Sequence, residues 1–338
     1  MLDTMYELCA LNGVSGREEA VRNYIIEKIG NKAEVSVDAL GNVIAFVKGR
    51  KRAARRVMLD AHMDEVGLII TAVTDDGMLK FATVGGIETA VLMARTVVLN
   101  GIYGVISTKP IHLIKKDDEK KLPEKDELYI DIGAKNKEEA ETHVSVGDVA
   151  AFLPDRVNSG DRVITKALDD RAGCAAVLDI INDDPEYDFY ASFSVLEEVG
   201  AGARAAAFKI DPQYAIVLES TTAADLRGVP DEKQVCKGGE GAVISFMDHG
   251  TLYDRDLFNE TLREAQRKGI KCQVKCAVAG GNNAAGIHVT RGGVKTVAIS
   301  VPCRYIHSPS SSADINDILA VKDLARAMLS KMASGELG

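Results

Sequence analysis

Hydrophobic residues along this chain are spaced for helices in some regions and for strands in others. The beginning is predicted to form two helices, because apolar residues recur at helical spacing after residues 15–18, which fit a capping box. Residues 33–49 carry an apolar run on each side of Leu40-Gly41-Asn42 and predict a hairpin. Residues 55–73 form a nearly continuous apolar stretch, interrupted by acids and one histidine, that predicts one strand.

The second half of the chain alternates between helical and strand patterns. Helical spacing occurs at 171–183, 203–210, 254–270 and 314–334, and apolar runs typical of strands occur at 187–200, 214–223, 272–281 and 295–302. This alternation predicts an α/β fold in which a mixed central sheet is flanked by helices on both faces.

Between these regions the pattern changes to short alternating segments, at 78–84, 95–108 and 144–153, which lie between glycines and charged loops. Such segments predict a small β-barrel or sandwich. We therefore expect a discontinuous main domain, residues 1–70 and 162–338, with a small β-barrel domain inserted at 71–161. The charged run 114–127 within the insert is expected to be a solvated or mobile loop rather than a binding site.

Composition narrows the class of protein. The formal net charge of -9 argues against nucleic acid or an anionic membrane as a partner. The N-terminal segment lacks the basic and apolar regions of a secretion signal, and no apolar run approaches the roughly 20 residues of a membrane helix. Six cysteines are scattered along the chain, as is typical of reduced thiols, so a cytoplasmic protein is expected.

Histidine and acidic residues stand at the ends of several apolar runs. They are His62 and Asp64, Asp169 and Asp170, Glu197 and Glu198, Glu219, and His307. Ligands of open α/β sheets bind outside the carboxyl ends of the strands, so these scattered residues could converge on one site. Two imidazoles and several carboxylates suit zinc, cobalt or manganese, and the lack of cysteine favours a catalytic site. They suffice for two ions that share a bridging carboxylate.

Each of these residues also has an ordinary structural explanation. A lone histidine at a strand end is usually only hydrogen-bonded, and two aspartates before a helix could serve as its N-cap. A continuing strand would point the neighbours Glu197 and Glu198 to opposite faces. They serve one centre only if the strand ends there and the chain turns, which Gly200 and Gly202 permit.

The combination is far more specific than its members. Along the chain the order is HxD, DDR, EEVG, an acid and a last histidine. The order of these motifs resembles that in the two-zinc exopeptidases of clan MH. The stretches LDAHMDEVG, KALDDRAG, EEVGAGAR and RYIHSP look like those of the tetrahedral (TET-type) aminopeptidases, peptidase family M42, also labelled cellulase M. The resemblance covers essentially the whole chain, including a β-rich insert after the HxD stretch.

The resemblance implies a metal-dependent aminopeptidase that removes N-terminal residues from short peptides. Two divalent ions per subunit would activate water, with zinc as the first choice and cobalt or manganese as alternatives. His62 would bind one ion and His307 the other, with Asp169 bridging both. Glu219 would complete the shell of the first ion and Glu198 that of the second.

Further roles are implied for the remaining residues. Glu197 would be the general base that takes a proton from the attacking water and delivers it to the leaving amine, and Asp64 would orient His62. Asp170 would not bind metal, and the peptide bond after Asp169 would be cis. Members of this family form large hollow homo-oligomers from dimers, so a dodecamer is expected, with the 71–161 insert helping assembly and closing the entrance to each site.

Two stretches depart from the family pattern. Position 219 is more often aspartate, and Gly281-Asn282-Asn283-Ala284 stands where a GTDA-like stretch is common. We expect these departures to bear on specificity more than on activity. Two alternatives stay open: a deacylase or carboxypeptidase-like amidase on the same scaffold, or a non-catalytic binding scaffold. A glycosidase also uses paired carboxylates, but it would leave both histidines unexplained.

Overall fold

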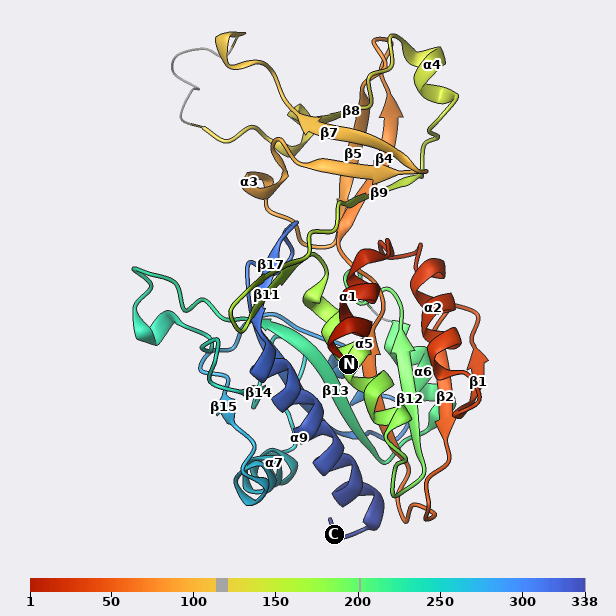
Figure 1. The fold of residues 1–338 in the computed structure, drawn as a ribbon, viewed down its shortest axis with the longest axis vertical. Helices are drawn as coiled ribbons and strands as arrows, with labels where there is room; N and C mark the ends of the chain where they lie inside the picture. Colours follow the sequence, from red (N-terminus) through yellow and green to blue (C-terminus); the bar gives the residue numbers. More distant parts are fainter. Residues whose placement is uncertain (114–120, 201, 338) are drawn as a thin grey trace.

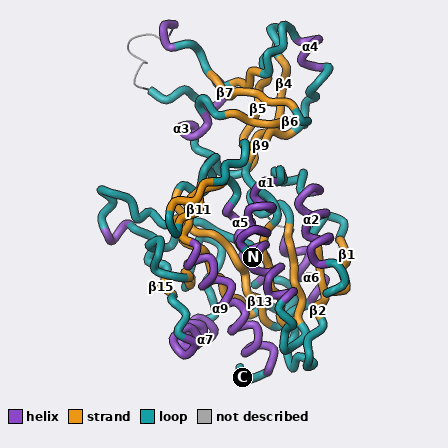
Figure 2. Tube along the Cα trace, viewed as in Figure 1, coloured by secondary structure: helices purple, strands orange, loops and turns teal. Residues whose placement is uncertain are grey.

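The computed structural model describes residues 1–113, 121–200 and 202–337 of the chain. A helix-covered sheet lies below and a β-barrel lies above it in Figure 1. The two units differ in secondary structure, as Figure 2 shows: helices surround the strands of the lower unit, whereas strands and loops make up most of the upper unit. Half of the charged run 114–127 that was expected to be a solvated loop, residues 114–120, lies outside the described residues.

The lower unit is built on one mixed sheet. In the described residues its strands follow the order β1 (Ala33–Val37), β2 (Val43–Val47), β12 (Phe189–Ser194), β3 (Val57–His62), β13 (Tyr214–Thr222), β16 (Lys295–Arg304), β17 (Ser311–Asp314), β11 (Arg162–Thr165) and β10 (Val157–Ser159). The strand β14 (Ala242–Ile244) pairs with β16 and with β15 (Cys272–Val274). The four central strands β12, β3, β13 and β16 are parallel, so their carboxyl ends meet at one edge.

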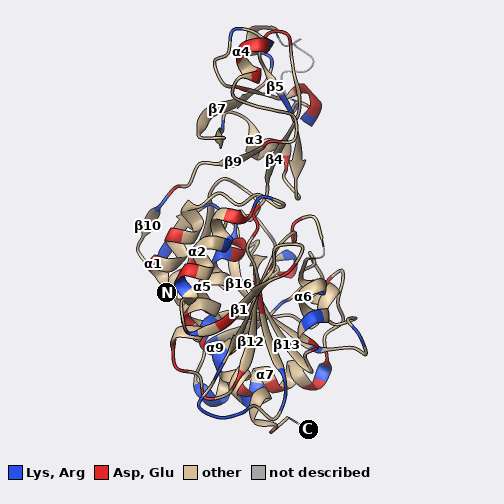
Figure 3. Ribbon diagram, turned by 90° about the vertical axis from the view of Figure 1, so that its right-hand side faces the viewer, with Lys and Arg blue, Asp and Glu red and all other residues tan. Residues whose placement is uncertain are grey.

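Helices cover both faces of this sheet, as Figure 3 shows from the side. One face packs against α1 (Leu2–Ala10), α2 (Glu19–Ile29), α5 (Leu168–Asn182) and α9 (Ile315–Ser334). The other packs against α6 (Gly202–Ile210) and α8 (Ala284–Ile287), while α7 (Arg255–Lys268) lies beside α9. Successive side chains of β3 point to opposite faces of the sheet. Leu59 therefore packs on the face covered by α1, α2, α5 and α9, and its neighbour Met58 packs on the other face. The predicted α/β fold is confirmed.

The upper unit is a closed barrel with its own core. Its strands follow the order β4 (Gly67–Val73), β5 (Leu79–Val84), β8 (Tyr129–Asp131), β7 (Ile102–Ser107), β6 (Thr96–Leu99) and β9 (Val149–Phe152). Its loops carry α3 (Thr89–Leu92), α4 (Lys137–Glu141) and the 3₁₀ turns Ile111–Leu113 and Lys125–Glu127, and a third such turn, Asp231–Lys233, lies in the lower unit. Leu68 and Ile70 alternate inward and fill the barrel interior.

Three local predictions were wrong. The segment 55–73 is two strands, because β3 ends at His62 and β4 begins a strand of the barrel; both are apolar, so periodicity could not separate them. The strand predicted at 272–281 ends at Val274. Ser15 caps no helix, because its hydroxyl donates to Asp64 and α2 begins after Glu18. Among the described helices, none is long and apolar enough to cross a membrane.

Candidate active site

Acidic and histidine side chains from five segments meet at the carboxyl ends of the central strands. His62 is the last residue of β3, Glu197 and Glu198 follow β12 directly, and Glu219 lies within β13. These side chains come together because of how the strands pair. The strand β3 lies between β12 and β13, and β12 pairs with β3 up to His62. Asp169 at the start of α5 and His307 beyond β16 complete a cluster of six of the eight side chains that the sequence singled out.

His62 is fully buried and points one ring nitrogen at the carboxylates. Its Nε2 atom lies 3.4 Å from Oδ1 of Asp169 and 3.6 Å from Oε2 of Glu219. Its Nδ1 atom lies 3.1 Å from the backbone carbonyl of Asp64, a contact that an Nδ1–H donor satisfies. The lone pair of Nε2 is then free to face the cluster.

His307 approaches the same aspartate from the other side. Its Nε2 atom lies 3.3 Å from Oδ2 of Asp169 and 3.3 Å from Oε2 of Glu198. Asp169 therefore presents one carboxylate oxygen to each histidine. The peptide bond between Asp169 and Asp170 is cis, as the resemblance implied, and Asp170 accepts the amide of Gly173 through Oδ1.

The donor atoms fit a metal site. The ligand atoms of His62, Asp169 and Glu219 lie within 4.8 Å of one another, and so do those of Asp169, Glu198 and His307. Among the described residues, Nε2 of His62, Oδ1 of Asp169 and Oε1 of Glu219 are buried without a hydrogen-bond partner. Buried polar atoms rarely stay unpaired, so atoms that converge in this way are suited to hold divalent cations.

Burial also shapes the protonation of the cluster. Loss of hydration raises the pKa of Glu197 to about 7 and that of Glu198 to about 8. Burial lowers the pKa of His307, but the hydrogen bond to Asp169, the charges of Glu198 and Asp169 and the contact with Gly86 together outweigh it, and the pKa is raised to about 9. Protons thus partly offset the crowded negative charge, and a divalent cation can replace them.

Asp64 holds the two glutamates through their backbone. Its Oδ1 atom accepts the amide of Glu197 at 3.0 Å, and its Oδ2 atom accepts the amide of Glu198 at 3.1 Å and the hydroxyl of Ser15 at 2.6 Å. The strand ends at Ser194, so both glutamates can face one centre.

Sequence reasoning missed a buried ionic cluster behind the site. Oε1 of Glu65 accepts Nζ of Lys166 at 2.8 Å and the amide of Gly13 at 2.9 Å, and it lies 3.6 Å from Arg171. These contacts tie the N-terminal segment to the loop that carries Asp169. Charged residues close beside the recognised motifs were the available signal.

The two asparagines that depart from the family pattern lie near this edge of the sheet. Nδ2 of Asn283 donates to Oδ2 of Asp60 and to Oγ of Ser194, both at 2.8 Å. Asn282 bonds instead to Tyr253 and Asp248. The neutral amide of Asn283 can donate to the buried Asp60, which a second ionised carboxylate could not do.

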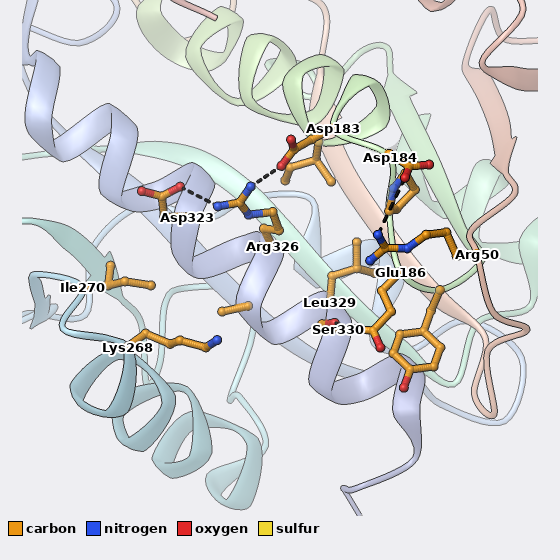
Figure 4. A pocket seen from close by; sticks show the side chains of 14 residues that line it. Arg50, Asp183, Asp184, Glu186, Lys268, Ile270, Asp323, Arg326, Leu329 and Ser330 are labelled. Carbon is orange, nitrogen blue, oxygen red and sulfur yellow. Dashed lines mark hydrogen bonds and ion pairs between the residues drawn. The ribbon is translucent and has the colours of Figure 1, made fainter.

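A separate cavity of about 490 Å³ lies beyond the amino end of β12 (Figure 4). Five of its charged residues pair with one another: Arg326 with Asp183 and Asp323, and Arg50 with Asp184. This cavity lies at the end of the strands opposite to the candidate active site.

Comparison with known proteins agrees with the geometry. Residues 41–324 match the sequence model of the M42 glutamyl aminopeptidases. The chain is 33% identical to the lysyl aminopeptidase of Pyrococcus furiosus, over 98% of this chain and 97% of that protein. It superimposes on an aminopeptidase of the archaeon Desulfurococcus kamchatkensis with a TM-score of 0.93 and 32% identity, covering 98% and 95% of the two chains. The TET1 peptidase of Pyrococcus horikoshii gives a TM-score of 0.86 and 34% identity, covering 97% and 98%.

Proposed function

Because this chain belongs to the M42 glutamyl aminopeptidase family and is thus a metal-dependent aminopeptidase, we propose that it cleaves N-terminal residues from short peptides at the His62–His307 cluster. The observation that carries this proposal is the position of Asp169, with one carboxylate oxygen near each histidine. An aspartate between two imidazoles is suited to bridge two cations.

We assign the residues to two adjoining cation positions. His62, Asp169 and Glu219 would hold the first, and Asp169, Glu198 and His307 the second. Bound there, two divalent cations would polarise the scissile carbonyl and make water a stronger nucleophile. Zinc is our first choice, with cobalt or manganese as alternatives, because imidazole and carboxylate donors suit all three.

Glu197 is the proposed general base. It lies at the cluster, with Oε2 4.0 Å from Nε2 of His62. Its ligand atom also lies within 4.8 Å of those of His62 and Glu198, but we assign it to neither cation position. Burial raises its pKa to about 7, so near neutral pH it can accept a proton from the attacking water and return it to the leaving amine. Asp64 would keep Glu197 in place through its backbone amide and would orient His62 through the carbonyl contact at Nδ1.

We further propose that the two units have different functions. Residues 1–70 and 162–338 would form the catalytic unit, and residues 71–161 would support assembly and cover the entrance to the site. The barrel strand β7 offers exposed apolar side chains for assembly, with Tyr103 66% exposed and Val105 45% exposed.

A cytoplasmic homo-oligomer, a dodecamer in particular, is the assembly we propose. The Pyrococcus horikoshii relative can assemble into a tetrahedron or a large octahedral shell. The six free cysteines suit the reducing cytoplasm. Native mass measurement tests the subunit number.

The function is tested with metal-free protein and two kinds of substrate. Chelation should abolish hydrolysis of amino-acid p-nitroanilides, and Zn²⁺ or Co²⁺ should restore it. A peptide with an acetylated N-terminus should resist cleavage, because the enzyme requires a free α-amine. Cleavage of the blocked peptide would instead support the deacylase or carboxypeptidase-like alternative. Hydrolysis that persists without metal would refute the mechanism.

A further inference from the structure

The backbone that leads into the two site glutamates is held by side chains from other segments. Four consecutive amides take part, each donating to a side-chain oxygen of a residue distant in sequence. The pairs are Val195 to Asn42 at 2.9 Å, Leu196 to Glu18 at 3.3 Å, Glu197 to Asp64 at 3.0 Å, and Glu198 to Asp64 at 3.1 Å.

These contacts take the place of a strand ladder. The strand β12 ends at Ser194, so the following amides no longer pair with β2 or β3. Leu196 also has a φ of 61°, in the left-handed region that leucine rarely adopts. A residue in that conformation needs surrounding contacts to hold it, and Leu196 stands immediately before Glu197.

Glu18 supplies the contact at Leu196. It is only 5% exposed, and its Oε1 atom also accepts the amide of Gly16 at 2.8 Å, which orients the carboxylate. The side chain forms no capping bond to α2. It therefore joins the N-terminal segment directly to the loop that carries the glutamates.

We propose that Glu18 is a positioning residue for Glu197, acting through the amide of Leu196. The inference rests on the proposed function, because it takes Glu197 as the general base. Glu18 would touch neither substrate nor metal. It would fix the left-handed turn at Leu196 and thereby the direction in which the next side chain leaves the backbone. Small displacements of a reacting group cost about 100-fold in rate, so this contact should matter for turnover.

The role depends on the reach of the oxygen atom and not on charge, and two conservative variants separate these properties. Glu18→Gln keeps the side-chain length and an acceptor oxygen but removes the charge. Glu18→Asp keeps the charge but withdraws the oxygen by one methylene. Glu18→Ala removes the acceptor altogether. Glu19→Gln is the matched control, because Glu19 is the exposed neighbour at the start of α2.

Three measurements on the metal-loaded protein test the proposal: kcat and KM with an amino-acid p-nitroanilide, bound metal after gel filtration, and the midpoint of thermal unfolding. We expect Glu18→Ala and Glu18→Asp to lower kcat by about tenfold or more, with KM and metal content nearly unchanged because Asp64 still holds Glu198. Glu18→Gln and the control should stay within about threefold of the unaltered protein.

Several results would overturn the proposal. An active Glu18→Asp with an inactive Glu18→Gln would mean that charge, and not reach, is required. A kcat of Glu18→Ala equal to that of the unaltered protein would mean that the contact does not position Glu197. If bound metal and thermal stability fall together with kcat in both Glu18→Ala and Glu18→Asp, Glu18 has a general structural role instead. If the unaltered protein itself lacks activity while binding metal, it is the proposed function that fails.

Discussion

The ring of His307 reaches the β-barrel, where its Nδ1 atom lies 3.0 Å from the carbonyl oxygen of Gly86. An Nδ1–H that donates to this carbonyl leaves Nε2 with a lone pair directed at the site. The loop between β5 and α3 thus orients a candidate metal ligand of the lower unit. The barrel therefore contributes directly to the geometry of the site.

The neighbouring glycine in this loop should be intolerant of a side chain. Gly85 has a φ of 80°, in the left-handed region, and an added Cβ would lie 2.7 Å from Val66 and 3.3 Å from Glu198. We expect Gly85→Ala to lose about 1–2 kcal/mol of stability and to weaken metal binding by displacing Glu198. Thermal unfolding and metal titration measure both effects.

Gly86→Ala is the matched control for that variant. An added Cβ there meets only Nδ1 of His307, at 3.5 Å, an ordinary contact. It should retain metal and stability. Equal behaviour of the two variants would contradict the claim that the loop packs closely against Glu198.

The two adjacent glutamates should separate into two phenotypes. Glu197→Gln is expected to reduce kcat by about 100-fold or more while metal content stays normal, because a neutral amide cannot accept the proton. Glu198→Gln should instead lose bound metal, since its Oε2 lies with His307 in a ligand group. Metal analysis alongside kcat distinguishes the two, and loss of metal in Glu197→Gln would reverse our assignment.

Asp64→Asn should disturb the site without removing a ligand. The two oxygens of Asp64 accept both glutamate amides, and one oxygen of an asparagine would become an amino group facing an N–H donor. We expect kcat to fall by about 10-fold to 100-fold. A crystal structure of the variant should display a shifted Glu197–Glu198 turn, and an unchanged turn with unchanged kcat would show that Asp64 is dispensable.

An ion cluster between α7 and α9 should make stability depend on pH. Lys331 bonds to Glu260 and lies 3.5 Å from Glu264. The hydrogen bond from Lys331 lowers the pKa of Glu260, and the bond from Glu260 raises the pKa of Lys331. The glutamate contribution is present above its ordinary pKa of about 4.3 and is lost as the pH falls through the lowered value. The lysine contribution is present below about 10.4 and is lost as the pH rises through the raised value.

Lys331→Met should therefore reduce the free energy of unfolding by about 0.5–1 kcal/mol at pH 7 and by much less near pH 3. Urea unfolding at the two pH values measures this difference. Lys268→Met is the control, because no ion pair of Lys268 is found among the described residues. A loss of stability that is equal at both pH values would mean that packing, and not charge, explains the effect of Lys331→Met.

Sequence reasoning succeeded where side-chain spacing or residue order carries the information. The helix at 314–334 was predicted from its apolar spacing and corresponds to α9, Ile315–Ser334. The six side chains of the site were chosen as acids and histidines at the ends of apolar runs, and they lie together. Such positions are recognisable because polar groups at the end of a buried strand need partners.

The sequence by itself determined the α/β class, the inserted barrel and which acids and histidines gather at the edge of the sheet, because periodicity and residue type are local properties. Only the tertiary structure decided that 55–73 divides between sheet and barrel, that Gly86 orients His307, and that Glu18 and Asp64 hold the turn at Leu196. The physical reason is that these contacts join segments far apart in sequence. A hydrogen bond between a side chain and a distant amide leaves no periodic trace in either segment.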